Sequence, residues 1–569
     1  MGKLIKCCAI VFCMMFLYEA SAQGVDRKFS VNMNKTVHKV NPLFWGTNFL
    51  FWIEDDAALT DQKIENSLKN MPCTILRYPG GTVADNFHWK TNMLDNRFRF
   101  PREEGATESD FDEFMAFCLR VNAEPILVVN TESWQIKQNL DEGAREAADW
   151  VQYCKDKGYK VKYWEIGNET YWHPFFTARE YGQTVKKYAQ AMKAVDPTIK
   201  IAANGHWDVE MVGTKERTTV SQLETIRQMY LNIASEADTD AADAYADQYK
   251  NTDIRSGTEK WWNVVAEECG ADIDMISVHW YYSGGANMSN MTTSLNLVRQ
   301  VFKTKYPNRE YMMGMTEYNC NNDDHKQAIS GLFEGIGRFL MAGVEIGNFW
   351  PLRNGISGNR RSILGLNTKE EGYAYQVLQL MGNNLKENIL EINTENQIFP
   401  IATYDGNQLT IFVSGRGITQ DYVNATMTLP EMGQFTLMDA KSYDAPLLNT
   451  VPIRLVENDL TTTNTATTCT FKVMPLQTVI LRFKNNNSAA ETVYSNGSAK
   501  IHTQGRNINI STDNDVRVTL YNMQGLKVNQ SFGKESIKMS VPTAGIYLVK
   551  IESLQSGCEV QKIIVNDEN

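Results

Sequence analysis

Two glutamates each close a short apolar run and could act together on one substrate. Glu169 ends the stretch 163–169, where the amide of Asn168 directly precedes it. Glu317 follows a second apolar run, 311–316, far downstream. One carboxylic acid can pass a proton to a departing oxygen while a second carboxylate attacks the reacting carbon, which is the chemistry of glycosidic bond cleavage. The sequence therefore predicts a paired-carboxylate site, with Glu169 as general acid/base and Glu317 as nucleophile.

Four polar residues at the ends of apolar runs are predicted to serve this pair. Arg77 would favour the ionised form of the nucleophile Glu317, because an opposite charge stabilises a carboxylate. Asn168 could hold the sugar hydroxyl next to the reacting carbon, a contact that strengthens in the transition state. His279 and Tyr281 end another run and could orient Glu317 or bind the substrate.

Tryptophans at or beyond the ends of the apolar runs are candidate walls for sugar rings. Aromatic faces pack well against the apolar faces of sugars. The candidates are Trp45, Trp89, Trp134, Trp172, Trp280 and Trp350.

The elements that must position these residues form a repeating series. Eight short apolar runs alternate with helical patterns, at 43–48, 74–78, 125–129, 163–167, 199–203, 273–278, 311–316 and 344–350. Strands alternating with helices predict an α/β fold, a (β/α)8 TIM barrel over residues 41–385. In such barrels the working residues lie at the C-terminal ends of the strands, where both glutamates fall. Glu165, inside its strand, is interpreted as structural.

Helix boundaries can be read from capping residues. Ser109 and Asp112 predict a capping box before an amphipathic helix, and Thr177 with Glu180 predicts a second box. A further helix is expected over 141–157, ending at Gly158. The connection 204–271 is unusually long and contains helical segments.

Beyond residue 385 the pattern changes to period two, which is typical of strands. Residues 386–484 are predicted to form a β-sandwich that includes the strand at 29–40. A polar linker at 485–495 then leads to a small all-β module at 496–569.

The N-terminus is typical of an export signal. Residues 1–22 combine a basic start, an apolar run and an Ala-Ser-Ala cleavage site, so a signal peptide and a secreted or cell-surface protein are expected. Loss of its two lysines and one glutamate would change the formal charge of the chain from −11 to −12. Such an acidic protein is a poor candidate for binding nucleic acid, and no membrane insertion is expected. A neutral polysaccharide or oligosaccharide is the preferred partner.

The cysteines do not form the pattern of a disulfide framework or a zinc site. Seven remain after the expected cleavage, at 73, 118, 154, 269, 320, 469 and 558. The number is odd, the spacing is wide and no Cys-x-x-Cys pair occurs, so most are expected to be buried thiols. No metal and no cofactor is expected.

Several stretches together resemble a known group of enzymes. Residues 164–169, 316–319, 76–81 and 278–281 are similar to motifs of clan A glycoside hydrolases, and the likeness over about 29–484 is greatest to α-L-arabinofuranosidases of family 51. This resemblance implies a retaining hydrolase whose acid/base and nucleophile follow strands four and seven. Tyr318 stands where many of those enzymes carry a tryptophan. A β-xylosidase, endoglycanase or agarase of the same clan therefore remains an open alternative. A non-catalytic carbohydrate-binding surface protein is a separate alternative, against which the presence of both acids argues.

The C-terminal module resembles the sorting domains of secreted Bacteroidetes proteins. The likeness rests on the turn at 521–525 and the strand at 544–551. It implies an interaction with secretion machinery, by a type IX route, or retention at the cell surface. A plain accessory β module is the alternative.

Overall fold

The computed structural model describes residues 24–95, 109–172, 176–211, 220–233, 239–247, 259–282, 287–320, 324–354, 362–446, 454–486, 494–495, 499–522, 525–553 and 557–565. The expected signal peptide at 1–22 lies outside the described residues. The chain divides into two compact units, one of them holding residues 1–433 and 437–483 and the other holding 434–436 and 484–569.

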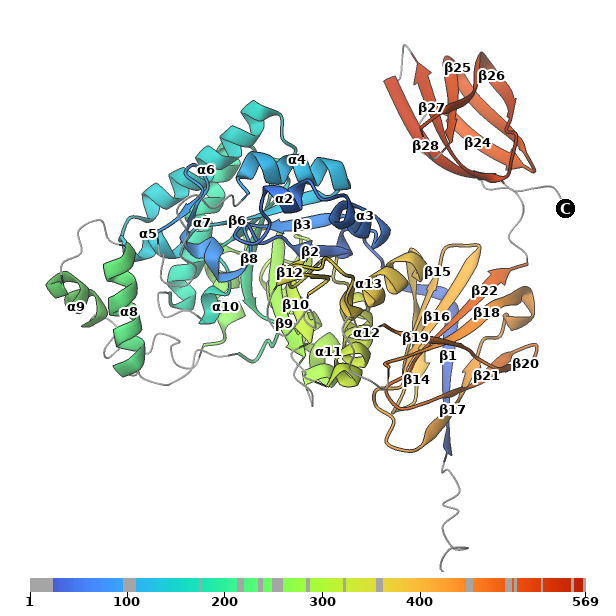
Figure 1. Cartoon of the computed structure of the whole chain (residues 1–569), viewed down its shortest axis with the longest axis horizontal. Helices are drawn as coiled ribbons and strands as arrows, with labels where there is room; N and C mark the ends of the chain where they lie inside the picture. Colours follow the sequence, from blue (N-terminus) through green and yellow to red (C-terminus); the bar gives the residue numbers. More distant parts are fainter. Residues whose placement is uncertain are drawn as a thin grey trace, which may run out of the picture. The chain divides into compact units, whose positions relative to one another are not determined.

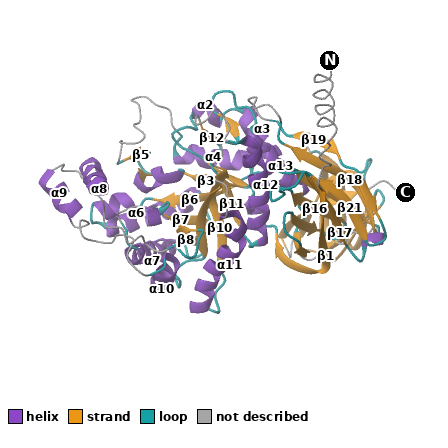
Figure 2. Ribbon diagram, turned by 90° about the horizontal axis from the view of Figure 1, so that it is seen from below, coloured by secondary structure: helices purple, strands orange, loops and turns teal. Residues whose placement is uncertain are grey.

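Eight parallel strands close into a barrel, which confirms the predicted fold class. In spatial order they are β10 (Met312–Cys320), β11 (Ile346–Phe349), β2 (Gly46–Asn48), β3 (Ile75–Tyr78), β6 (Glu124–Val129), β7 (Tyr163–Ile166), β8 (Lys200–His206) and β9 (Met275–Tyr282). Helices surround these strands, as Figures 1 and 2 show. The main ones are α3 (Gln62–Asn70), α4 (Phe111–Val121), α6 (Leu140–Lys157), α7 (Ala178–Val195), α10 (Trp261–Cys269), α11 (Asn287–Lys305), α12 (His325–Met341) and α13 (Tyr373–Asn384).

The helix ends follow local capping chemistry. Thr177 and Glu180 form the predicted capping box of α7, and Gly158 ends α6 in the left-handed conformation. The box predicted for α4 is wrong by one residue. Asp110 and Glu113 form it instead, because the side chain of Asp110 accepts from the backbone N–H of Glu113, and that of Glu113 accepts in return.

The interior of the barrel is layered. Near the N-terminal ends of the strands lies a layer of apolar side chains, from Ile75, Ile126, Tyr163, Ala202, Met275 and Ile346. One step further along the strands the interior residues become polar, among them Arg77, Glu165 and Ser277, all fully buried. In its described residues, the long connection after β8 holds two helices besides α10, namely α8 (Val220–Ile233) and α9 (Thr239–Asp247).

The predicted sandwich is present as a ten-stranded sheet in the same compact unit. Its order is β19 (Val456–Asp459), β18 (Phe435–Asp444), β22 (Thr478–Asn485), β16 (Gln408–Ser414), β15 (Phe399–Tyr404), β14 (Asn388–Thr394), β1 (Gly24–Lys39), β17 (Tyr422–Thr428), β21 (Thr468–Val473) and β20 (Thr462–Asn464). The N-terminal strand β1 lies between β14 and β17, so this sheet combines both ends of the unit.

The C-terminal module is all β and has a core of its own. It contains β23 (Tyr494–Ser495), β24 (Ala499–Gln504), β25 (Asn507–Asn522), β26 (Lys527–Ser540), β27 (Gly545–Ser553) and β28 (Gly557–Val565). Its buried apolar residues all lie between Ile501 and Val565.

Six cysteines in the described part of the chain, 73, 118, 154, 269, 320 and 469, are buried free thiols, as expected. Within that part of the chain, no helix combines the length and the apolar character that a membrane crossing requires.

Candidate active site

The two glutamates predicted to work together do lie together. Glu169 follows β7 and Glu317 lies in β10, and a carboxylate oxygen of one comes within 4.8 Å of a carboxylate oxygen of the other. The side chain of Glu317 is 7% exposed, whereas that of Glu169 is 23% exposed. One carboxylate is thus enclosed and the other is open to solvent. This asymmetry suits a buried nucleophile and an acid/base that exchanges protons with water.

A shift in strand pairing turns Glu317 into the barrel. Met315 of β10 pairs with Val278 of β9, yet Glu317 pairs with His279, so Thr316 is an extra residue. Such a β-bulge breaks the alternation of side chains along a strand. Thr316 and Glu317 therefore both direct polar atoms at interior partners, Glu165 and Tyr281 respectively.

The turn after β7 presents Asn168 and Glu169. The backbone N–H of Asn168 donates to Oδ1 of Asp85 at 2.9 Å, which fixes the turn from the neighbouring loop. Asn204 at the end of β8 donates through Nδ2 to the carbonyls of Ile166 and Gly167 at 2.9 and 3.0 Å. Glu169 itself has φ +46°, in the left-handed region. The local backbone is therefore held from two sides in a conformation that few residues adopt.

Arg77 links residues from several strands of the barrel through hydrogen bonds. Its Nη2 donates to Oδ1 of Asn168 at 2.8 Å, and its Nη1 donates to Oδ1 of Asn48 at 2.9 Å and to Oε2 of Glu317 at 3.4 Å. Because Oδ1 of Asn168 is held by the guanidinium, its Nδ2 is a buried donor with no protein partner among the described residues. A sugar hydroxyl would satisfy that donor.

His279 and Tyr281 contact the two carboxylates from β9. The hydroxyl of Tyr281 donates to Oε1 of Glu317. Nδ1 of His279 lies 3.0 Å from Oε1 of Glu169 and 3.7 Å from Oε2 of Glu317. Tyr171, from the 3-10 turn at Thr170–Trp172, also donates to Oε1 of Glu169, at 3.2 Å.

Burial and neighbouring charges act against each other at Glu317. Burial raises the pKa of its carboxyl, and the adjacent Glu169 carboxylate adds to this, whereas His279, Arg77 and Tyr281 act to lower it; the net pKa is raised. Burial acts to lower the pKa of His279, but the carboxylates of Glu317 and Glu169 outweigh it and the net pKa is raised. The cationic imidazolium is thereby favoured beside the two acids.

The predicted sugar contacts of Trp45 and Trp280 are wrong. Trp45 precedes β2 at the N-terminal end of the barrel, away from the two glutamates, and is 5% exposed. Trp280 is 1% exposed and packs edge-on against Phe339 of α12, with ring centroids 5.3 Å apart. The alternation of β9 explains this, because His279 and Tyr281 face inward and the residue between them must face outward.

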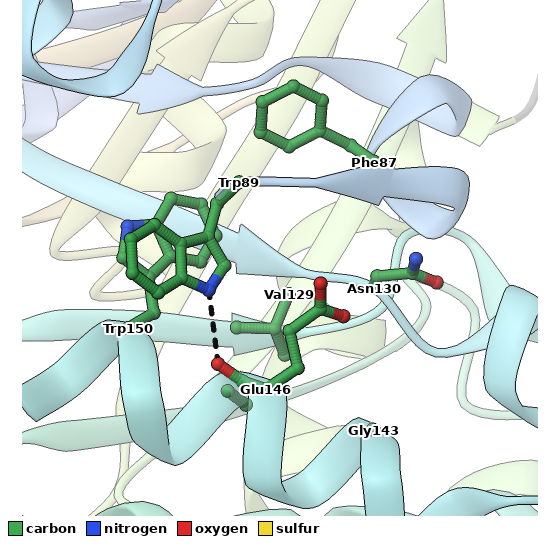
Figure 3. A pocket seen from close by; sticks show the side chains of 8 residues that line it. Phe87, Trp89, Val129, Asn130, Gly143, Glu146 and Trp150 are labelled. Atoms are coloured by element: carbon green, nitrogen blue, oxygen red, sulfur yellow. Dashed lines mark hydrogen bonds between the residues drawn. The ribbon is translucent and has the colours of Figure 1, made fainter. Parts of the chain in front are cut away.

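Trp89 and Trp134 are half-buried and are tied to Glu146 of α6. The indole N–H of Trp89 donates to the backbone carbonyl of Glu146 at 3.1 Å, and that of Trp134 donates to its carboxylate at 2.7 Å. Trp89 stacks on Trp150, with centroids 5.7 Å apart and planes 5° apart. Figure 3 shows Trp89 beside Trp150 and its bond to Glu146, at a hollow that Phe87, Val129, Asn130 and Gly143 also line. One ring face of Trp89 is thus already covered, and sugar contact by these tryptophans stays a prediction.

Trp350 follows β11 at the C-terminal end of the barrel and is half-buried. A Cβ atom added at Gly81 would lie 2.5 Å from its ring, so the loop after β3 passes close over it. This place is compatible with the predicted wall, which stays a prediction. Trp172 is 41% exposed and lies 5.4 Å from the ring of His206, centroid to centroid.

Several residues that support the site were not predicted from the sequence. They are the buried polar residues Asn48, Asp85, Asn204, Ser277 and Thr316. Asn48 accepts from Arg77, and Asp85 accepts from the backbone N–H of Asn168. Asn204 donates to the backbone of the turn after β7, whereas Ser277 and Thr316 donate to Glu165. The available signal was a polar residue within or just after an apolar run, and the sequence contains many such residues.

Comparisons with known proteins agree with this architecture. Residues 67–255 match the family model described as alpha-L-arabinofuranosidase 1 domain, and residues 504–566 match the secretion system C-terminal sorting domain. An alpha-L-arabinofuranosidase C from Emericella nidulans is 25% identical over 324 residues, which is 50% of this chain and 54% of that protein. The chain thus spans about half the length of the curated relatives it matches.

Two solved structures share the fold. The α-L-arabinofuranosidase of Thermotoga maritima aligns over 81% of this chain and 100% of its own, with a TM-score of 0.58 and 17% identity. A family 51 α-L-arabinofuranosidase from Bifidobacterium longum aligns over 82% of this chain and 100% of its own, with a TM-score of 0.59 and 14% identity.

The sorting domain indicates export, with the protein secreted or held at the cell surface. Together these matches agree with the resemblance stated from the motifs: residues 67–255 are similar to the alpha-L-arabinofuranosidase 1 domain, residues 504–566 are similar to a secretion system C-terminal sorting domain, and the chain shares the fold of solved α-L-arabinofuranosidases.

Proposed function

We propose that this protein is an exported retaining glycoside hydrolase acting on plant or algal polysaccharide or oligosaccharide, with α-L-arabinofuranosides as the first-choice substrate. The observation that carries the proposal is the approach of the Glu169 and Glu317 carboxylates to within 4.8 Å. Retaining glycosidases hold their two carboxyls about 5–5.5 Å apart, whereas inverting enzymes need roughly 6.5–9.5 Å to admit a water molecule.

In the first step Glu317 attacks the anomeric carbon, and the bond from that carbon to the glycosidic oxygen breaks. Glu169 donates its proton to the departing oxygen. In the second step Glu169 takes a proton from water, whose oxygen displaces Glu317 from the same carbon. Arg77 and Tyr281 would hold the carboxylate of Glu317 through the hydrogen bonds described above, and Nδ2 of Asn168 would donate to the neighbouring sugar hydroxyl.

The choice of sugar rests on the relatives. The curated relative from Emericella nidulans and the two solved structures are named α-L-arabinofuranosidases. A β-xylosidase, endoglycanase or agarase would use the same pair of acids, so a panel of substrates must decide. We also propose that residues 1–22 are a signal peptide and that the C-terminal module addresses secretion machinery.

The test compares wild type with variants of the proposed nucleophile on a panel of aryl glycosides that includes 4-nitrophenyl α-L-arabinofuranoside. Glu317→Gln should lower kcat by on the order of 10⁴-fold while sugar binding persists. Glu345→Gln is the control, because Glu345 accepts from the backbone N–H of Met313 near the other end of the barrel. It should retain wild-type turnover.

Product stereochemistry separates the roles of the two acids. Azide should rescue Glu317→Ala and give a glycosyl azide of inverted configuration, whereas azide rescue of Glu169→Ala should give the retained configuration. Normal turnover by Glu317→Gln would refute the nucleophile assignment. A wild-type protein that binds glycans and cleaves none of the panel would instead favour a carbohydrate-binding surface protein.

A further inference from the structure

A third carboxylate, Glu165, lies directly beneath the proposed catalytic pair. Its side chain is fully buried in β7. Oε2 accepts from Nε of Arg77 at 2.7 Å, and Oε1 accepts from the hydroxyls of Ser277 and Thr316, the latter at 3.2 Å. Each of its partners comes from a different strand of the barrel, so Glu165 is the acceptor on which these side chains converge.

The guanidinium of Arg77 lies closer to the carboxylate of Glu165 than to that of Glu317. Nε of Arg77 lies 2.7 Å from Glu165, whereas Nη1 lies 3.4 Å from Glu317. Because the attraction between charges falls with distance, the nearer carboxylate takes the larger share of the guanidinium charge. The same contact fixes the guanidinium plane, and through it the Nη2 bond to Asn168 at 2.8 Å.

Stability alone gives little reason for a charge at this position. Residues of the adjacent layer show that the barrel interior can be filled with apolar side chains. Replacing a buried ion pair by well-packed apolar residues is often neutral or stabilising, because desolvation offsets the attraction. A carboxylate that contacts the arginine of the site therefore points to a role in the chemistry.

We propose that Glu165 is a positioning residue of the glycosidase proposed above: it holds Arg77 in the orientation that orders Asn168, and it offsets guanidinium charge that would otherwise act on Glu317. The inference rests on the proposed function, since it is that function which makes the ionisation of Glu317 matter.

The charges around Glu317 give the direction of the effect. The groups that face it are Arg77 from β3, His279 and Tyr281 from β9, and Glu169 and Tyr171 from the turn after β7. Burial raises the pKa of Glu317 despite the nearby arginine. Removing the negative charge of Glu165 would leave more of the Arg77 charge to stabilise ionised Glu317, so the pKa of Glu317 should fall.

The central experiment is Glu165→Gln. The amide oxygen can still accept from Arg77, and the amide nitrogen can donate to the oxygen of a neighbouring hydroxyl, so the shape is kept while the charge is lost. The acid limb of the kcat/KM profile reports the ionisation of the free enzyme's base or nucleophile. It should move to lower pH by about one unit in Glu165→Gln. An acid limb at the wild-type pH would overturn the proposal.

A matched control removes a different buried carboxylate. Glu334 is 3% exposed and pairs with Arg338 and Arg416 at 2.7 and 2.8 Å, but neither arginine contacts Glu169 or Glu317 in the described structure. Glu334→Gln should leave the acid limb in place, and an equal shift in this control would overturn the proposal.

A second variant tests positioning by itself and does not depend on Glu165→Gln folding. Glu165→Asp keeps the charge but withdraws the carboxylate by one methylene from Nε of Arg77. It should lower kcat at least about 10-fold, because Asn168 loses its support. Wild-type kcat and KM in this variant would refute the positioning role.

Carboxyl NMR separates this inference from the proposed function. With glutamate labelled by ¹³C at the carboxyl, the resonance lost in Glu317→Gln identifies Glu317, and its titration midpoint can be followed without turnover. A lowered midpoint in Glu165→Gln supports the inference even if no glycoside is cleaved, an outcome that would refute only the proposed function. Cleavage with an unmoved midpoint refutes the inference and leaves the function intact.

Discussion

Burial and four neighbouring side chains set the pKa of the Glu317 carboxyl. Burial and Glu169 oppose the charged form, whereas His279, Arg77 and Tyr281 favour it. Burial is the largest of these influences and the net pKa is raised, but each of the four side chains also acts on the carboxyl, so the working pH range should respond to changes in any single neighbour. This balance makes pH profiles more informative than loss of activity alone.

The hydroxyl of Tyr281 offers the cleanest test of that balance. It donates to Oε1 of Glu317, and a donor to the charged form lowers a carboxyl pKa. Tyr281→Phe should therefore raise the pKa of Glu317 further, so the acid limb of kcat/KM should move to higher pH by about one unit. The neighbour Tyr282 faces α12, where its hydroxyl lies 3.5 Å from Oε1 of Gln327, and Tyr282→Phe is the control. A shift to lower pH in Tyr281→Phe would contradict the described donor geometry.

At the residue scale the sequence predicts the members of the site better than its supporting contacts. The two acids and Arg77, Asn168, His279 and Tyr281 are brought together as expected. The sequence did not reveal that Glu165 bonds to Arg77, because the registers of β3 with β6 and of β6 with β7 decide which interior side chains meet. The sequence itself argued against including Trp280. Side chains alternate along a strand, so His279, Trp280 and Tyr281 cannot all face the barrel interior.

At the scale of elements, two irregularities build the site. The bulge in β10 directs both Thr316 and Glu317 at interior partners. The turn after β7 has Gly167 at φ +71° and Glu169 at φ +46°, both in the left-handed region. All eight barrel strands overlap runs predicted from apolar pattern, but neither irregularity was predictable, because a bulge is defined by the pairing with a neighbour.

Gly167 can be tested against a glycine with the same backbone conformation. Gly158 ends α6 at φ +72°, and a Cβ there would meet nothing within 4 Å. A Cβ at Gly167 would lie 2.7 Å from Oγ1 of Thr131 and 2.8 Å from Oγ1 of Thr170. Either alanine should cost about 1 kcal/mol in the free energy of unfolding for its backbone conformation.

Only Gly167→Ala should also displace the turn that carries Asn168 and Glu169. We expect kcat to fall about 10²-fold in that variant and to stay at the wild-type value in Gly158→Ala. Denaturant unfolding and steady-state kinetics on both variants provide the measurement. Equal kinetics in the two would show that the turn tolerates the added methyl group.

At the scale of the whole molecule, the barrel and the sandwich share one buried core and lie in one compact unit. Ile401, Phe412 and Ile480 of the sandwich belong to the same buried cluster as the barrel core. Glu334 of α12 pairs with Arg416, which follows β16, at 2.8 Å. The period-two pattern predicted the strands of the sandwich but not this shared core, because packing between separate elements leaves no mark on spacing along the chain.

The C-terminal module should be dispensable for catalysis and needed for sorting. In the described residues, its buried apolar cluster consists of side chains between Ile501 and Val565. A chain ending after residue 486 should keep the kcat/KM and the main calorimetric unfolding transition of the full chain. The control ends before Thr478 and so lacks β22, which lies between β18 and β16, and it should fail to fold. Loss of turnover in the first truncation would show that the module contributes to the active unit, whereas unchanged surface delivery in cells would refute its sorting role.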